Sequence, residues 1–526
     1  VTLSHNLNTL GEYAFGSCTS LTEIQIPKSL ISAPVDSFFP KGPFEGSGLT
    51  TVTFENGTTS VPANLFRGAN KLKNVSLLET MTSIGINAFN SCSALEKITI
   101  PDSVMKIDEN AFNACDALKE VTLSQNLQEL YQGAFAECTS LQKIYIPKSL
   151  QTVRVDSFFP VGPFANSGIS DVTFEPGMTS VPSNLFRGAT ALNTISLLDT
   201  MTVLGTSVFD GCTKLQAVTM PNSIQTIGEY AFAGCTTLQE VQLSSNLTNL
   251  YANAFSGCIS LEEITIPKSL CNVIVDSFFP EGPFEESGLK KVTFEPGTSS
   301  VLPNLFRGAA YLSDVTLVDT ITSIGASAFE GCSSLEQIHL PDSISYISSY
   351  AFISCEKLTS IIIPERVTKI EKGTFSSCVA LEEISLPSTL TSIGDDAFSN
   401  CTSLKMVHFP NSITNIGNSA FSGSGLTSIL LPSQCLSLGK NSFQNCDSLS
   451  SVILSNALQQ IGDRTFYDCD VLEEIVLPDS VQSIGANCFH HCDLLKTVIL
   501  GEGILKIPNY AFYECPMLIS INLPKH

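Results

Sequence analysis

Four residues near the C-terminal end of the chain are of the types that bind transition metals, namely Cys488, His490, His491 and Cys492. Thiolates and imidazoles are preferred ligands of Zn²⁺, which structural sites hold in a tetrahedron. Side chains so close together in the sequence fit that tetrahedron poorly, because the backbone between them has little freedom to aim each one at the same ion. All four also occupy regular places in a pattern that runs through the chain. We therefore expect no metal site here.

The chain has 18 cysteines, and fifteen of them lie three residues after a phenylalanine, as Cys92 follows Phe89. In seven other places of the same kind the residue is Ala or Ser, which indicates a small buried slot that a free cysteine fills as a compact apolar residue. A ladder of disulfide bonds is the alternative. Neighbouring strands lie ~4.8 Å apart, which exceeds the ~3.8 Å between bonded Cβ atoms. We predict free, unreactive thiols, and expect Cys271 and Cys435, which lie outside the pattern, to react most readily.

Composition and motifs argue against several classes of function. The formal net charge is −23, whereas nucleic-acid binding needs a basic surface. No apolar run approaches the ~20 residues of a transmembrane helix. Nucleotide-binding loops, zinc-protease helices and nucleophile elbows are absent from the sequence. We expect neither an enzyme nor a cofactor, and no membrane insertion within this chain.

One sequence pattern covers the whole chain. From Ala88-Phe89 it reads Ala-Phe-x-x-Cys-x-x-Leu-x-x-Ile-x-Ile-Pro-x-Ser-Val-x-x-Ile, and the next copy begins 23 residues later at Ala111-Phe112. A phenylalanine marks each of the 22 copies: Phe15, Phe44, Phe66, Phe89, Phe112, Phe135, Phe164, Phe186, Phe209, Phe232, Phe255, Phe284, Phe306, Phe329, Phe352, Phe375, Phe398, Phe421, Phe443, Phe466, Phe489 and Phe512.

A second period of 120 residues is superimposed on the first. The spacing of 29 and then 22 residues between motif phenylalanines begins at Phe15 and recurs from Phe135 and from Phe255. We interpret this as tandem duplication, with super-repeats at 16–135, 136–255 and 256–375, followed by diverged units at 376–526. Since no linker interrupts the pattern, we predict one continuous domain over residues 1–526.

Each repeat predicts a short strand that ends at a proline. The alternation in Leu-x-x-Ile-x-Leu is typical of a strand with one buried face, and proline ends it because it cannot donate to the next strand. One repeat of this length cannot bury its own apolar face, but stacked repeats cover one another. We predict a β-rich repeat solenoid, a superhelix of about 22 units with its strands in a parallel sheet.

The repeat closely resembles the BspA-like, or Treponema pallidum-type, leucine-rich repeat, over the entire chain. The resemblance implies an extracellular or cell-surface protein, since the family is found mostly on bacterial surface or secreted proteins and its characterised members are adhesins. It implies protein or glycan partners, such as host matrix or cell-surface molecules, and no catalytic residues. The alternative is an intracellular or periplasmic interaction scaffold. Because neither end shows the polar cap that solenoids normally need, we expect the chain to be part of a longer protein.

The longer repeats carry an insertion with two phenylalanines before a proline, at Phe38-Phe39, Phe158-Phe159 and Phe278-Phe279. One interpretation is that these rings cover a core widened by the insertion. The other is that Phe39, Phe159 and Phe279 form a row of contact points for a repetitive or multivalent partner.

A final candidate site lies on the strands near the C-terminal end. The residue between the last two apolar positions of each strand points away from the core, and through most of the chain it is Thr, Ser or Gln. In four consecutive repeats it becomes aliphatic, at Leu430, Ile453, Val476 and Ile499. We predict that this aliphatic row contacts a partner or a second copy, since exposed apolar residues rarely align by chance. Simple β-propensity is the alternative.

Overall fold

The computed structural model describes residues 1–35, 40–156, 158–278 and 280–522. The chain separates into two compact units, Val1–Leu261 and Glu262–His526. Each unit is a stack of β-strand turns, and no α-helix occurs in the described residues. The predicted solenoid of ~23-residue repeats is confirmed, with about 20 turns. Continuity of one domain across both units stays a prediction.

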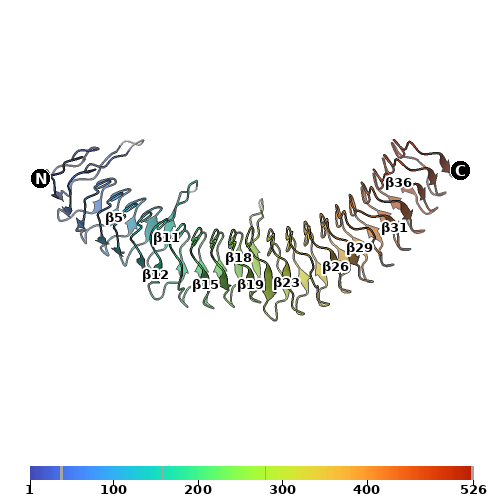
Figure 1. The fold of residues 1–526 in the computed structure, drawn as a ribbon, viewed down its shortest axis with the longest axis horizontal. Helices are drawn as coiled ribbons and strands as arrows, with labels where there is room; N and C mark the ends of the chain where they lie inside the picture. The colour runs from blue at the N-terminus through green and yellow to red at the C-terminus, as the bar shows by residue number, and fades with distance from the viewer. Residues whose placement is uncertain (36–39, 157, 279, 523–526) are drawn as a thin grey trace. The chain divides into compact units, whose positions relative to one another are not determined.

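Each turn of the first unit contributes up to two short strands (Figure 1), and these fall into two series of small parallel sheets, which we call ladders. Strands of the first ladder follow the Leu-x-x segment of the repeat: β1 (Glu23–Ile26), β2 (Thr51–Phe54), β4 (Asn74–Val75), β6 (Lys97–Thr99), β8 (Glu120–Thr122), β10 (Lys143–Ile146), β12 (Asp171–Phe174), β15 (Ala217–Thr219) and β17 (Glu240–Gln242). Strands of the second ladder come later in each repeat: β3 (Ser60–Val61), β5 (Ser83–Ile84), β7 (Lys106–Ile107), β9 (Glu129–Tyr131), β11 (Thr152–Arg154), β13 (Ser180–Val181), β14 (Val203–Leu204), β16 (Thr226–Ile227) and β18 (Asn249–Tyr251).

The second unit has the same two ladders. Its first ladder consists of β19 (Glu263–Ile266), β21 (Lys291–Phe294), β23 (Asp314–Thr316), β26 (Ser360–Ile362), β28 (Glu383–Ser385), β31 (Ser428–Leu430), β33 (Ser451–Ile453), β35 (Glu474–Val476), β37 (Thr497–Ile499) and β38 (Ser520–Asn522). Its second ladder consists of β20 (Asn272–Ile274), β22 (Ser300–Val301), β24 (Ser323–Ile324), β25 (Tyr346–Ile347), β27 (Lys369–Ile370), β29 (Ser392–Ile393), β30 (Asn415–Ile416), β32 (Ser437–Leu438), β34 (Gln460–Ile461) and β36 (Ser483–Ile484).

All strand pairs within each unit are parallel and keep the register of the repeat. In β6 and β8, for example, Lys97 pairs with Glu120 and Thr99 pairs with Thr122, one repeat further along the chain. Equivalent residues of successive turns therefore lie one strand spacing apart, at ~4.8 Å. As a result, a property shared by several consecutive repeats forms a straight column along the ladder.

The motif phenylalanines form the core of each unit. All of them except Phe15 and Phe512, at the two ends, are fully buried. Neighbouring rings stack nearly parallel, with centroids 5.0 Å apart between Phe89 and Phe112 and 5.8 Å apart between Phe186 and Phe209. Their backbone continues the ladder, since the N–H of Phe89 donates to the carbonyl of Ala111 in the next turn. Stacking of this kind adds to the free energy of burying each ring.

The cysteines of the repeat form a column of hydrogen-bond donors beside this stack. Apart from Cys18, each thiol donates to the carbonyl oxygen of the phenylalanine one turn earlier; Cys92 Sγ, for example, lies 3.2 Å from the Phe66 oxygen. The same bond recurs at Cys115, Cys138, Cys212, Cys235, Cys258, Cys332, Cys355, Cys378, Cys401, Cys446, Cys469, Cys492 and Cys515. A thiol that donates to a carbonyl gives that oxygen a second bond, because the oxygen also accepts a backbone N–H, as Phe66 does from Ala69.

Serine replaces this bond where the next repeat carries alanine. Ala189 has no donor for the carbonyl of Phe164, and instead the hydroxyl of Ser167 donates to that oxygen from within its own turn, at 2.7 Å. Ser287 does the same for Phe284, also at 2.7 Å. The Cys, Ser and Ala of this slot are therefore not interchangeable fillers, since two of them are hydrogen-bond donors that act in different turns.

Replacing a central ring should reveal how much the phenylalanine stack contributes. Phe232 is fully buried between Phe209 and Phe255, with centroids 5.2 and 5.3 Å away. We expect Phe232→Ala to lower the free energy of unfolding by about 3–5 kcal/mol, because it leaves a cavity and interrupts the stack. Denaturant unfolding followed by circular dichroism measures the change. Phe232→Leu serves as the control and should cost clearly less; equal stability of Phe232→Ala and the native chain would contradict the prediction.

Candidate binding surfaces

The aliphatic row predicted from the sequence lies on four neighbouring strands of the second unit, β31, β33, β35 and β37. The structure pairs Leu430 with Ile453 and Val476 with Ile499. Three of the four side chains are exposed, at 65 % for Leu430, 58 % for Ile453 and 46 % for Val476, and Ile499 is half-buried. The residue before each of them in its strand faces the core, as Ile475 does in β35. The row is thus an unpartnered aliphatic surface in the described part of the chain.

Negative charge lies at the entrance to the same strands. Asp447, Asp470 and Asp493 each follow a cysteine of the repeat and precede β33, β35 and β37. In the fold they occupy equivalent places in three successive turns, and so form a column of like charges. Burial raises the pKa of the Asp470 carboxyl, and repulsion by Asp468, Asp493 and Asp447 raises it further. We call these three aspartates the acidic column.

The insertion loops place aromatic rings in solvent. Phe158 is 85 % exposed and Phe159 is 82 % exposed, in the loop that follows β11 and projects beyond its neighbours (Figure 1). Phe278 is equally exposed in the matching loop after β20, and Asp276 Oδ1 accepts its backbone N–H at 2.6 Å. For these three residues the interpretation as a cover for the core is wrong, because their rings are exposed to solvent. The chain returns to the regular path of the turn at the glycine and proline that follow the insertion. Phe39 and Phe279 lie outside the described residues.

The cysteines outside the repeat pattern differ from one another. Cys271 is exposed, as expected. Cys435 is fully buried, and the expectation that it reacts readily is wrong: it fills the slot that Val104 fills in an earlier repeat, and burial raises its pKa to about 11. Cys18, which has the repeat position, is exposed instead. Within the stack, burial raises the pKa of the Cys258 thiol to about 12.

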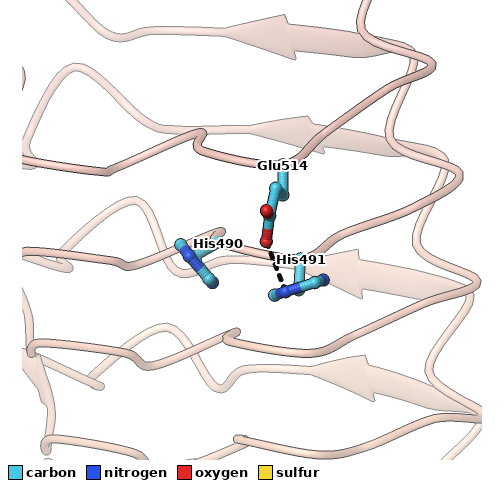
Figure 2. Close-up of side chains that lie close together, drawn as sticks. All are labelled: His490, His491 and Glu514. Atoms are coloured by element: carbon cyan, nitrogen blue, oxygen red, sulfur yellow. Dashed lines mark ion pairs between the residues drawn. The ribbon is translucent and has the colours of Figure 1, made fainter.

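The two histidines near the C-terminal end come together with a residue from another turn. Cys488 and Cys492, which the sequence places beside them, are both buried in the core. Glu514, one repeat further along, forms an ion pair with His491, with 2.5 Å between Nε2 and Oε2 (Figure 2). His490 stacks between the rings of Tyr467 and Tyr513. The sequence analysis did not consider Glu514, although it lies one 23-residue period from His491.

A shallow depression of about 850 Å³ lies over β8, β10 and β12 in the first unit. Its lining is mainly polar and includes Thr122, Gln142 and Thr173. Tyr145 is the exposed aromatic residue in it, and Lys143 pairs with Asp171 beside it at 3.0 Å. In the sequence Tyr145 is simply an outward-facing residue of its strand, and only the arrangement of neighbouring turns sets it within a hollow.

These features define a leucine-rich-repeat solenoid, and comparison with known families makes the assignment specific. The model of the BspA type leucine rich repeat region matches in six copies, at residues 1–40, 37–161, 159–282, 279–391, 368–475 and 459–526. The chain belongs to this family, and the resemblance stated from the sequence is confirmed. No curated protein sequence matches the chain.

Several solved structures are similar to parts of the chain. A leucine-rich repeat protein from Bacteroides ovatus is 24 % identical, with 79 % of this chain and 86 % of that chain covered and a TM-score of 0.39. A leucine rich cell surface protein from Faecalibacterium prausnitzii is 22 % identical, with 66 % and 86 % covered and a TM-score of 0.34. The pneumococcal vaccine antigen PcpA is 20 % identical, with 62 % and 74 % covered and a TM-score of 0.35.

The described residues contain no helix capable of crossing a membrane.

Thiol titration should separate buried from exposed cysteines. A thiol reacts as the thiolate, and burial with a raised pKa suppresses that form. We expect a disulfide reagent at mildly alkaline pH to modify Cys18 and Cys271 rapidly in the folded chain and the half-buried Cys515 more slowly. After addition of denaturant, all 18 cysteines should react. Mass spectrometry of peptides identifies the sites; rapid labelling of Cys435, or disulfides between neighbouring turns, would show the assignment to be mistaken.

The acidic column should make stability depend on pH. Because the pKa of Asp470 is raised on folding, the folded chain holds this proton more tightly, and stability falls as pH rises through that pKa. Asp470→Asn should therefore raise the melting temperature at pH 7. The gain in the free energy of unfolding should be less than about 1 kcal/mol. The gain should vanish below the ordinary aspartate pKa of about 3.9.

Asp116→Asn is the matched control for this measurement. Asp116 occupies the same place after Cys115, but Ser93 and Thr139 hold the equivalent positions of the adjacent turns. We expect no pH-dependent stabilisation from it. A gain for Asp116→Asn as large as that for Asp470→Asn would show that the column does not act as a unit.

Proposed function

We propose that this protein is a non-catalytic interaction scaffold that binds a partner protein through the aliphatic row of the second unit. The family assignment supports a repeat scaffold, and the row supplies the surface. Leu430, Ile453 and Val476 remain exposed where most other turns carry polar residues, and the backbone ladder beneath them holds the side chains about 4.8 Å apart. A partner that covers these apolar side chains would gain binding energy roughly in proportion to the apolar area removed from water.

Charge complementarity defines the chemistry of the partner. The chain carries a net charge of −23, and the acidic column lies at the entrance to the strands that carry the row. Glu474 is exposed within β35 itself. A partner with an apolar patch bordered by lysine or arginine would desolvate the aliphatic side chains while it pairs with these carboxylates. The charges would mainly speed association, and the apolar contacts would slow dissociation.

The location and the partners that the resemblance implies belong to the same proposal. We propose a surface or secreted protein whose partner is an extracellular protein, such as a matrix component. The exposed rings of Phe158, Phe159 and Phe278 add a second set of apolar contacts, which a repetitive partner could engage at more than one loop. Phe39 and Phe279 occupy the matching places in the sequence.

The double variant Ile453→Thr/Val476→Thr tests the proposal. Threonine is the native residue at the equivalent positions Thr99 and Thr122, so folding should be preserved. We expect binding to a panel of purified matrix proteins, or self-association measured by sedimentation, to weaken about tenfold or more because the central contacts are lost. Thr99→Ala/Thr122→Ala is the matched control at the equivalent positions of the first unit and should bind as the native chain does.

Two results would contradict the proposal. One is equal binding by the native chain and the Ile453→Thr/Val476→Thr variant. The other is binding to a glycan array that Tyr145→Ala abolishes and the double variant leaves unchanged, because that result would place recognition in the polar depression of the first unit. A soluble dye that fluoresces on apolar surfaces provides an independent measure, and its signal should fall in the double variant.

A further inference from the structure

His491 and Glu514 occupy the same place in two successive turns of the second unit. Each lies two residues after a motif phenylalanine, Phe489 or Phe512, and each has a left-handed backbone, with φ of 60° and 55°. The turns are joined directly, because the N–H of His491 donates to the carbonyl of Tyr513 at 3.1 Å. The two side chains are therefore held next to each other by the ladder rather than by a flexible loop.

His490 brings a third possible ligand to the same point. One ring nitrogen of His490, one of His491 and one carboxylate oxygen of Glu514 all lie within 4.8 Å of one another (Figure 2). Tyr467 and Tyr513 fix the plane of the His490 ring, with centroids 4.8 and 4.9 Å away on the preceding and following turns. A ring held in this way loses little conformational freedom when it binds an ion.

The polar environment of His490 leaves a nitrogen without a partner. Its Nδ1 is buried and makes no hydrogen bond to any described residue. A neutral imidazole can donate the lone pair of such a nitrogen to a metal. The ion pair between His491 and Glu514 accounts for two of the three groups, but it gives the His490 nitrogen no partner.

Two imidazoles and a carboxylate are a ligand set that suits Zn²⁺, with bonds of about 2.0–2.2 Å. Tetrahedral ligands at that distance stand about 3.4 Å apart. The longest separations, up to 4.8 Å, must shorten by roughly 1–1.5 Å, and His491 Nε2 and Glu514 Oε2, now 2.5 Å apart, must move apart to about 3.4 Å. Rotation of the half-exposed side chains of His491 and Glu514 can supply both movements. Cys488 and Cys492 take no part, since the Cys492 thiol donates to the carbonyl of Phe466 inside the core.

We propose that His490, His491 and Glu514 form a binding site for Zn²⁺, with three protein ligands and the remaining position open to water or to a side chain of a partner. The site differs from the metal-binding cluster that the sequence suggests at first sight, because it takes one ligand from the next turn and excludes both cysteines. It involves none of the residues of the aliphatic row, so its test is independent of the proposed function.

Zinc titration of the untagged, chelator-treated chain is the direct test. We expect calorimetry to show one site on a Cys18→Ser/Cys271→Ser background, which removes the exposed thiols. His491→Ala and Glu514→Gln should weaken binding by about tenfold or more. His490→Phe should do the same while it preserves the stack with Tyr467 and Tyr513. His339→Ala/His408→Ala, which removes two histidines elsewhere in the chain, is the control and should bind zinc as the background does.

Two further measurements guard against misfolding and against other ligands. Zinc should raise the melting temperature of the background chain but not that of the three ligand variants, whose metal-free melting temperatures should match the background. Co²⁺ should give visible d–d absorption without the near-ultraviolet band of a thiolate ligand. Three results would each overturn the proposal. The first is no zinc binding by the background chain, and the second is zinc binding by His490→Phe and His491→Ala that equals binding by the background chain. The third is a thiolate band with Co²⁺.

Discussion

A single turn of this chain has apolar side chains on both of its faces, and neither face can be buried without another turn against it. The in-register backbone ladder satisfies this requirement, because it places every residue directly over its equivalent in the next turn. The phenylalanine stack follows from that register, and so does the donation of each thiol to the carbonyl one turn earlier. Since the interior keeps the same pattern of apolar and small residues from turn to turn, the larger differences between turns lie in side chains that point outward.

Much of this architecture could be predicted from the sequence because each position of the repeat keeps the same kind of residue from copy to copy. The period placed Phe232 and its equivalents in the core, and the alternation within Ser-Ile-Leu and Glu-Ile-Val predicted that Leu430 and Val476 point outward in β31 and β35. Cys435 was misjudged because only its distance from the cysteine column was considered. Its position after Pro432 matches that of Val104 after Pro101, which is a buried slot.

The remaining features depend on geometry that no single repeat contains. Nothing in residues 488–492 indicates that Glu514 joins His490 and His491. Glu514 becomes a neighbour of His491 only when the 23-residue period is used to align one turn with the next. The exposure of Phe158 and Phe159 depends on how the insertion closes: the N–H of Phe135 still donates to Pro163, directly before the next motif phenylalanine, so the added residues bulge outward. The sequence shows that an insertion exists, but not whether its residues point into the core or out into solvent.

The serines at positions 167 and 287 have a consequence for how such a chain can change over time. Most turns depend on their successor for the second hydrogen bond to the phenylalanine carbonyl, so that removal of one turn affects the one before it. Ser167 and Ser287 supply that bond from within their own turns. A turn that completes its own bonding does not depend on which residue its successor carries in this slot. At such turns a gene could gain, lose or exchange the following block of repeats without removing this hydrogen bond.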